Sequence, residues 1–236
     1  MIEALGASFI YGSALAFGLV VGSFLNVVAH RLPLGESVVS PRSRCPGCDN
    51  PIAAWDNLPL LSYLLLAGRC RNCGQRISLR YPAVELVTGL LFVAMAWQFG
   101  PTLLAPVFML FSAALLVGGL IDFDHQIIPD EISLGGLVVG LVAVPLVHSL
   151  DSDTAYASAL GWSVLGAALG GGLLWSVGFL HARLAVALGR SFAHWPGEGE
   201  ALPTPREADY WLWFPGLGLG DVKFLAMIGA FLGPWG

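Results

Sequence analysis

Charged residues are scarce in this 236-residue chain. It has 11 basic and 16 acidic side chains, which make up 11% of the sequence, whereas soluble globular domains carry about 25%. So few charges cannot cover a water-facing surface of this size, and the hydrophobic fraction is 56%. These values exclude an ordinary soluble enzyme, a disordered chain and a free nucleic-acid-binding protein. They indicate an integral membrane protein.

Long apolar runs predict an all-α, multi-pass architecture within a lipid bilayer. A helix needs about 20 apolar residues to cross about 30 Å of hydrocarbon. Five runs satisfy this length: Ser8–Val28, Pro82–Phe99, Thr102–Ile121, Ile132–Leu150 and Ala159–His181. A sixth run opens at Val222 and stops at Gly236, only 15 residues on, which is short for a crossing. We therefore expect about six transmembrane helices. The first run lacks a basic start and is too long for a cleaved signal peptide.

The distribution of positive charge predicts the orientation. Seven of the 11 basic residues lie between the first and second runs: Arg31, Arg42, Arg44, Arg69, Arg71, Arg76 and Arg80. Short loops rich in arginine and lysine stay in the cytoplasm. We therefore expect the N-terminus outside, a first helix over 1–29, a cytoplasmic domain over 30–81 and a membrane domain over 82–236.

All four cysteines lie in the predicted cytoplasmic domain, as the pairs Cys45–Cys48 and Cys70–Cys73 with 21 residues between them. Two such pairs supply the four thiolates of a closed tetrahedral zinc site. The alternative is two disulfides, which the reducing cytosol disfavours. A four-thiolate shell leaves no position for a substrate, so the pattern predicts a structural, zinc-ribbon-like loop domain.

Several carboxylates follow the third apolar run. Asp130 and Glu131 suit the first turn of the next helix, where they complement its dipole, with Pro129 in that turn. That explanation does not cover Asp122, which directly follows the apolar helix. Asp124 is either an ordinary solvated helix-end residue or a neighbour of the active site, and His125 is expected at the interface.

A second singular sequence, Gly216-Leu-Gly218-Leu-Gly220-Asp221-Val-Lys223, leads into the last apolar run. Asp221 is either the N-cap of the final helix or a functional carboxylate. The predicted topology puts Asp122 and Asp221 at the same, cytoplasmic side of the membrane. Two carboxylates that meet cannot both ionise, so one can activate water while the other donates a proton. The pattern thus favours an aspartic protease.

These motifs resemble those of the bacterial type IV prepilin peptidases, which are leader peptidases and N-methyltransferases of the Gly-x-Gly-Asp aspartic protease family. The resemblance runs nearly from end to end of the chain. Besides the cysteine pairs, it rests on Gly22–Pro33, Trp55–Tyr63, Arg80–Leu86, Ile121–His125, Pro129–Asp130 and Gly218–Lys223.

The resemblance implies the chemistry and the partners. Asp122 and Asp221 would be the catalytic aspartates, Gly218 and Gly220 would shape the second aspartate's loop, and Lys223 and Asp124 would lie in the active-site loops. The family acts in the bacterial inner membrane on prepilins and pseudopilins of type IV pili and type II secretion. It cleaves after a glycine at the cytoplasmic face and then methylates the new N-terminus with S-adenosylmethionine.

Two features depart from the family pattern. The segment 186–215 is longer than in many relatives and is expected to form a polar loop, at His194–Glu200, and then an interfacial aromatic patch, at Tyr210–Phe214, that could act as a lid. Relatives also continue past the second aspartate, so we expect that C-terminal helices of the family are missing here.

Other functions compete with this one. A non-catalytic, zinc-containing membrane scaffold would use the aspartates as caps, and presenilin-like proteases share the Gly-x-Gly-Asp motif but not the cysteine domain. The sequence assigns no methyl-donor site and no oligomeric state. Asn26 and Glu85 are weak candidates for the methyltransferase activity, and helix-packing hydrogen bonds explain them equally well.

Overall fold

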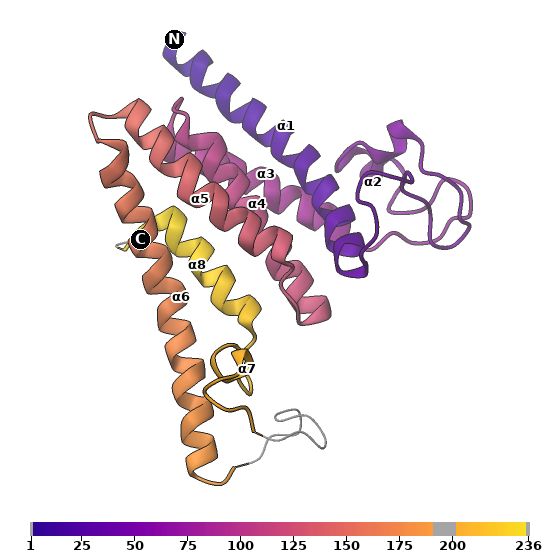
Figure 1. Cartoon of the computed structure of the whole chain (residues 1–236). Helices are drawn as coiled ribbons and strands as arrows, with labels where there is room; N and C mark the ends of the chain where they lie inside the picture. Colours follow the sequence, from indigo (N-terminus) through magenta and orange to yellow (C-terminus); the bar gives the residue numbers. More distant parts are fainter. Residues whose placement is uncertain (1, 191–201, 235–236) are drawn as a thin grey trace. The chain divides into compact units, whose positions relative to one another are not determined.

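The described part of the chain, residues 2–190 and 202–234, is built from helices joined by loops (Figure 1). In this computed structural model the predicted all-α class is confirmed. The β pairing among the described residues consists of isolated bridges, such as the one between Arg44 and Pro51. The helices form two compact units, Met1–Gln126 and Ile127–Gly236, and each unit is described by itself.

The first unit contains three long helices and the cysteine domain. Helices α1 (Ile2–Arg31) and α3 (Arg80–Phe99) pack against each other, and both contact α4 (Leu104–His125). Between α1 and α3 the chain forms the cysteine loops and three short helices. These are η1 (Leu32–Leu34), η2 (Ala54–Asn57) and α2 (Leu61–Leu65).

Glycines allow the backbones of α1 and α3 to touch. A Cβ atom on Gly18 would lie 2.7 Å from the Cα of Gly89, and one on Gly22 would lie 2.7 Å from the Cα of Glu85. Gly18 and Gly22 are four residues apart and therefore lie on one face of α1. Small residues at this spacing allow helices to pack closely in lipid, where no hydrophobic force drives them together.

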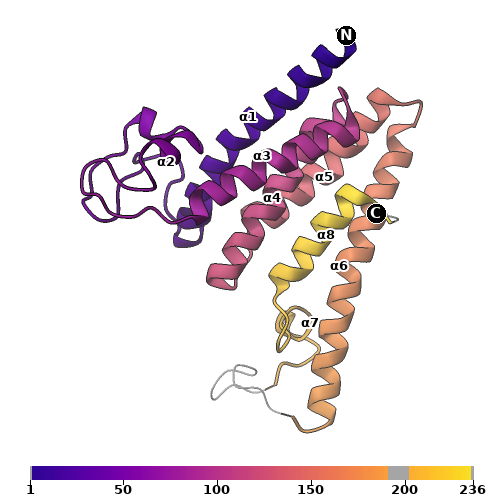
Figure 2. The same cartoon turned by 180° about the vertical axis from the view of Figure 1, so that it is seen from behind.

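In the second unit, glycines also allow helices to touch, here around the last helix. It contains α5 (Asp130–Asp151), α6 (Tyr156–Ala187), the short α7 (Ala208–Leu212) and α8 (Leu219–Leu232), and α8 packs against both α5 and α6 (Figure 2). A Cβ on Gly166 would lie 2.1 Å from the carbonyl oxygen of Gly229. A Cβ on Gly171 would lie 2.9 Å from the Cβ of Ala226 and 3.4 Å from the carbonyl oxygen of Val222.

The predicted membrane spans are confirmed as five long apolar helices, α1, α3, α4, α5 and α6. Helix α8 has 14 residues, or about 21 Å, so it is short for a sixth crossing of about 30 Å.

Two helix boundaries differ from expectation. Pro129 is the N-cap of α5, not part of its first turn, and α8 begins at Leu219, three residues before the predicted run. The three-part division at residues 29 and 81 concerns topology and stays a prediction.

The glycine contacts generate a stability prediction. Gly166→Ala places a methyl group against the α8 backbone and should destabilise the protein by about 1–3 kcal/mol, the usual cost of overpacking. Gly172→Ala on the same helix is the matched control, because a Cβ there meets nothing within 4 Å. It should leave stability unchanged or raise it slightly, since alanine favours helix. Thermal unfolding in detergent measures both, and equal effects would contradict the packing role of Gly166.

Candidate functional site

The motif around the second aspartate forms the first turn of α8. Gly218 is the N-cap, and Asp221 lies three residues into the helix, not at the cap that the sequence offered as one alternative. Its carboxylate Oδ2 accepts the backbone N–H of Gly218 at 3.2 Å. A carboxylate in the first helical turn is also stabilised by the helix dipole. The half-buried Asp221 is therefore held in a defined place at the start of α8.

The glycines of this motif differ in whether their backbone conformation and contacts require a glycine. Gly218 has a φ of −76°, which any residue adopts, and a Cβ on Gly220 would make only ordinary contacts, 3.5 Å from Ile128. Gly216 does need glycine, because its φ is +75°. It turns the chain between Phe214 and Leu217, which form an isolated bridge. The sequence places Gly216 in the motif but does not distinguish it from Gly218 and Gly220.

Lys223, the chain's one lysine, pairs with the carboxylate of Asp130. Asp130 is the first residue of α5 and Lys223 the fifth of α8, so this ion pair joins the starts of the two helices two residues from Asp221. From the sequence, the helix dipole alone was expected to account for Asp130. The structure adds a specific cationic partner.

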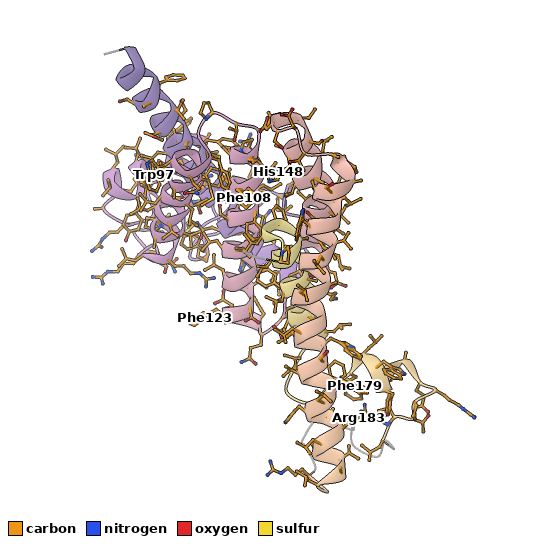
Figure 3. All side chains as sticks on the ribbon, turned by 90° about the vertical axis from the view of Figure 1, so that its left-hand side faces the viewer. Trp97, Phe108, Phe123, His148, Phe179 and Arg183 are labelled. Carbon is orange, nitrogen blue, oxygen red and sulfur yellow. The ribbon has the colours of Figure 1, made fainter. Side chains whose placement is uncertain are left out.

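An aromatic cluster attaches the loop before the motif to α6. Trp211 stacks on Phe179 with ring centroids 5.3 Å apart, and its carbonyl oxygen accepts the indole N–H of Trp175 at 2.8 Å. The guanidinium of Arg183 lies 3.6 Å from the ring centroid of Tyr210 and donates to that residue's carbonyl oxygen at 2.6 Å. Figure 3 labels Phe179 and Arg183 on α6.

The predicted aromatic patch therefore packs on α6 and carries the chain toward Gly216, an arrangement that does not support a free lid. The polar part of that segment, His194–Glu200, lies outside the described residues. The residues of α6 that bind the patch are Trp175, Phe179 and Arg183. Their four-residue spacing was a signal in the sequence, because residues four apart share a helix face.

The first aspartate lies in the last turn of α4, in the first unit. Ile121 is fully buried, whereas Asp122 is exposed. Asp124 is bound by Arg80, with 2.9 Å between Nη1 and Oδ1, and this pair joins the start of α3 to the end of α4. Asp124 thus has a role that neither expected alternative named, because its ion pair with Arg80 ties α3 to α4. Phe123 projects from the same turn and is 87% exposed (Figure 3).

The candidates for a methyltransferase role make structural contacts in the same unit. The side-chain amide of Asn26 donates to the carbonyl oxygens of Gly22 and Tyr81, both at 3.2 Å. Glu85 is buried in α3 and accepts the backbone N–H of Leu60 at 2.8 Å. These contacts agree with the helix-packing alternative.

The four cysteines form one cluster. Their sulfur atoms all lie within 4.8 Å of one another, and all four are free thiols. Cys45 and Cys73 have sulfurs 3.7 Å apart, close to the edge of about 3.8 Å of a tetrahedron with Zn–S bonds of about 2.3 Å. The donor set and its spacing fit a zinc ion.

The backbone around the cysteines favours a thiolate at one position. The backbone N–H groups of Cys73 and Asn72 lower the pKa of Cys70 to about 6. At Cys48 the N–H of Asn50 also lowers the pKa, but burial and the three other cysteines raise it to about 11. Because a metal takes thiolates as ligands, the lowered pKa favours the metal-binding form of Cys70.

The cluster predicts about one zinc per chain in purified protein. Cys73→Ser removes one donor and should reduce the bound zinc strongly, as measured by elemental analysis. Asn72→Ser, in the same turn but without a ligand atom, is the control and should keep the metal. Metal-free protein with two disulfides would overturn both the metal site and the cytoplasmic placement of this domain.

Known proteins resemble the chain along most of its length. A protein named Prepilin leader peptidase/N-methyltransferase from Myxococcus xanthus is 42% identical, over 91% of this chain and 54% of its own length. Proteins of the same name from Stutzerimonas stutzeri and Pseudomonas aeruginosa are each 38% identical, over 94% of this chain and 72% of their own length. The chain thus spans between about half and three quarters of these relatives. No solved structure matches it.

Family profiles agree with these relatives. The profile of the Bacterial Peptidase A24 N-terminal domain matches residues 16–99. The profile of the Type IV leader peptidase family matches residues 109–236, which include both candidate aspartates and the glycine motif. The chain therefore belongs to the type IV leader peptidase family.

Proposed function

We propose that this chain removes the leader peptide from type IV prepilins and pseudopilins and then methylates the new N-terminus. The observation that carries the proposal is the similarity over more than nine tenths of the chain to proteins named Prepilin leader peptidase/N-methyltransferase. We place the enzyme in the bacterial inner membrane, with its N-terminus outside. The arginine-rich loop between α1 and α3 supports this orientation, because such loops stay in the cytoplasm.

Asp122 and Asp221 are proposed as the catalytic carboxylates. Peptide hydrolysis needs one carboxylate to take a proton from water while the water oxygen attacks the scissile carbonyl carbon. The other carboxyl group protonates the carbonyl oxygen. The proton taken from water then passes from the first carboxyl group to the leaving amine as the C–N bond breaks, and the second carboxylate recovers its proton when the carbonyl forms again. Both aspartates lie at ends of apolar helices, and neither the Arg80 nor the Lys223 ion pair involves them.

The groups around Asp221 are suited to hold it for this chemistry. The Gly218 N–H fixes one carboxylate oxygen, and the Lys223–Asp130 pair anchors the helical turn that carries it. The absence of side chains at Gly218 and Gly220 leaves room for a peptide to approach the carboxylate. This explains glycines at two positions where the backbone conformation does not require them.

The implied cofactors have different roles. A zinc ion held by Cys45, Cys48, Cys70 and Cys73 would be saturated by thiolates and would fold the cytoplasmic loops without taking part in catalysis. S-adenosylmethionine would supply the methyl group. The described part of the chain holds no strand–helix unit of the kind that binds nucleotides, so no residue is assigned to the methyl donor.

Substitution of the aspartates tests the proposal against the scaffold alternative. Asp122→Asn and Asp221→Asn should each lower prepilin cleavage by about 10²–10⁴-fold, the usual contribution of a general acid or base. Asp124→Asn should cost less than about tenfold, because it weakens only a partly exposed ion pair worth about 0–1 kcal/mol. Cleavage is followed by the mass of the prepilin in membranes that contain the variant, with zinc content as the control for folding.

The outcome separates the alternatives. Unchanged cleavage in both Asp122→Asn and Asp221→Asn would exclude the aspartic mechanism. An inactive Asp124→Asn beside an active Asp122→Asn would move the first catalytic role to Asp124.

Charge should contribute little to leader recognition. Four acids lie within ten residues at Asp122, Asp124, Asp130 and Glu131, but Arg80 and Lys223 already neutralise two of them. Replacing the basic leader residues of a prepilin by glutamine should therefore raise KM only modestly. The effect should shrink as salt rises, because exposed charges are screened beyond about 10 Å at 0.1 M. Steady-state kinetics at two salt concentrations measure this, and a large, salt-insensitive loss would contradict it.

A further inference from the structure

The cysteine domain exposes a short apolar segment. Large apolar side chains of residues 55–65, from η2 through α2, are exposed: Trp55 by 69%, Leu58 by 50%, Leu61 by 58%, Leu64 by 73% and Leu65 by 83%. We call residues 55–65 the apolar segment. Contiguous exposed apolar surface of this kind marks a place that binds another apolar phase or protein.

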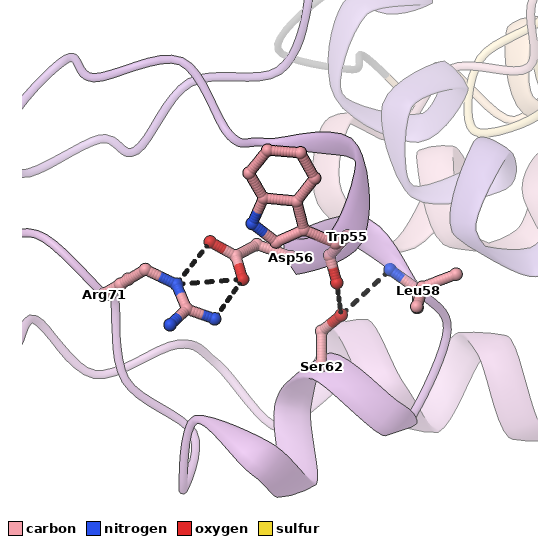
Figure 4. A network of polar contacts seen from close by, with 5 residues as sticks. All are labelled: Trp55, Asp56, Leu58, Ser62 and Arg71. Atoms are coloured by element: carbon pink, nitrogen blue, oxygen red, sulfur yellow. Dashed lines mark hydrogen bonds and ion pairs between the residues drawn. The ribbon is translucent and has the colours of Figure 1, made fainter.

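The apolar segment is held rigidly in this conformation (Figure 4). The buried hydroxyl of Ser62 donates to the carbonyl oxygen of Trp55 and accepts the N–H of Leu58, both at 2.9 Å. Asp56 binds Arg71 through two nitrogens, at 2.6 and 2.9 Å. The hydrogen-bonded guanidinium of Arg71 lowers the pKa of Asp56, so this tie is ionic at neutral pH. These hydrogen bonds and this ion pair thus hold the segment in a conformation in which the leucine side chains are exposed.

One hydrogen bond ties the apolar segment to a candidate membrane span. The N–H of Leu60 donates to the buried carboxylate of Glu85 at 2.8 Å. Glu85 lies five residues into α3, or about 7.5 Å along the helix from Arg80. Because α3 is a candidate membrane span, this bond holds the start of α2 beside the second turn of that span. Leu60 has a φ of +58°, a strained conformation that the surrounding structure must hold.

Charge next to the apolar segment suits a phospholipid surface. A surface cavity of about 580 Å³ is lined by Tyr63 of α2 together with Arg69 and Arg76. Arginines beside an apolar face are typical of segments that lie in the interface of anionic membranes, with the apolar side about 5–10 Å deep. The bond to Glu85 holds this apolar side next to a helix that is a candidate membrane span.

We propose that the apolar segment lies in the interfacial layer of the bilayer, with Leu61, Leu64 and Leu65 among the lipid chains and Arg69 and Arg76 at the phosphates. The cysteine domain is then held against the membrane by its own surface as well as by α1 and α3. This proposal does not depend on the proposed catalytic function.

Site-specific fluorescence in lipid nanodiscs tests this placement. A polarity-sensitive dye is attached through a non-canonical amino acid at Leu65, so that the cysteines stay untouched, in nanodiscs of phosphatidylethanolamine and phosphatidylglycerol. Lipids with a shallow nitroxide label should remove roughly half of the emission if the side chain lies at interfacial depth. Aqueous iodide should have little effect. A dye at Val39, 84% exposed in the same domain, is the control and should show the opposite pattern.

Glu85 variants test the cause of the depth. Glu85→Leu removes the acceptor for Leu60 and should lower the nitroxide quenching of the dye at Leu65 to the level seen at Val39. Glu85→Gln keeps an acceptor oxygen and should preserve the nitroxide quenching at Leu65. Bound zinc shows that the domain has folded in each variant. Iodide-accessible, lipid-insensitive emission at Leu65 in the unmodified background would overturn the proposal. Protection that appears only when prepilin is added would equally overturn it, and would assign the apolar segment to the substrate.

Discussion

Direct contact between helix backbones at glycine is the constraint on which the rest of this structure depends. In lipid, apolar side chains gain little from meeting one another, so helices associate through close packing and hydrogen bonds. At Gly22 the backbone of α1 reaches the Cα of Glu85, and at Gly166 the backbone of α6 reaches α8. The first contact sets where Glu85 lies, and the second sets where α8 lies. The region around Glu85 and the region at the start of α8 are therefore both positioned by glycines, which have no side chains.

Three of the ion pairs among the described residues have a recognisable structural task. Arg80–Asp124 joins α3 to α4, Lys223–Asp130 joins α5 to α8, and Arg71–Asp56 holds the loop before α2. Each of these pairs is partly exposed and fixes the end of a helix or a loop. The proposed catalytic aspartates lie beside two of these pairs in sequence but take part in none of them.

Much of the fold could be predicted because it follows from composition. The five long apolar helices and the cysteine cluster are confirmed, since run length and the two Cys-x-x-Cys pairs leave few alternatives. The sequence did not predict that Asp221 lies inside the first turn of α8, because glycines at positions 216, 218 and 220 suggest an extended loop. Only the φ of Gly216 and the capping contact reveal where the helix begins.

Other features depended on contacts between distant residues. Arg80 as the partner of Asp124, and Glu85 as the acceptor for Leu60, join positions 44 and 25 residues apart, and no local pattern predicts such pairs. The four-residue spacing of Gly18 and Gly22, and of Gly166 and Gly170, was a readable signal for close helix packing that the sequence analysis did not use. The roles of Asp122 and Asp221 remain predictions from sequence and family.

The length of α6 has a geometric consequence for this second unit. Gly171, which faces Ala226 and the carbonyl oxygen of Val222, lies 15 residues after Tyr156, or about 23 Å along the helix. Asp221 directly precedes Val222, so it lies about four helical turns from the beginning of α6. The packing of α8 on α6 fixes this separation. If Asp221 has its proposed catalytic role, α6 would set how far the scissile peptide bond of a substrate lies from the end of the helix at Tyr156.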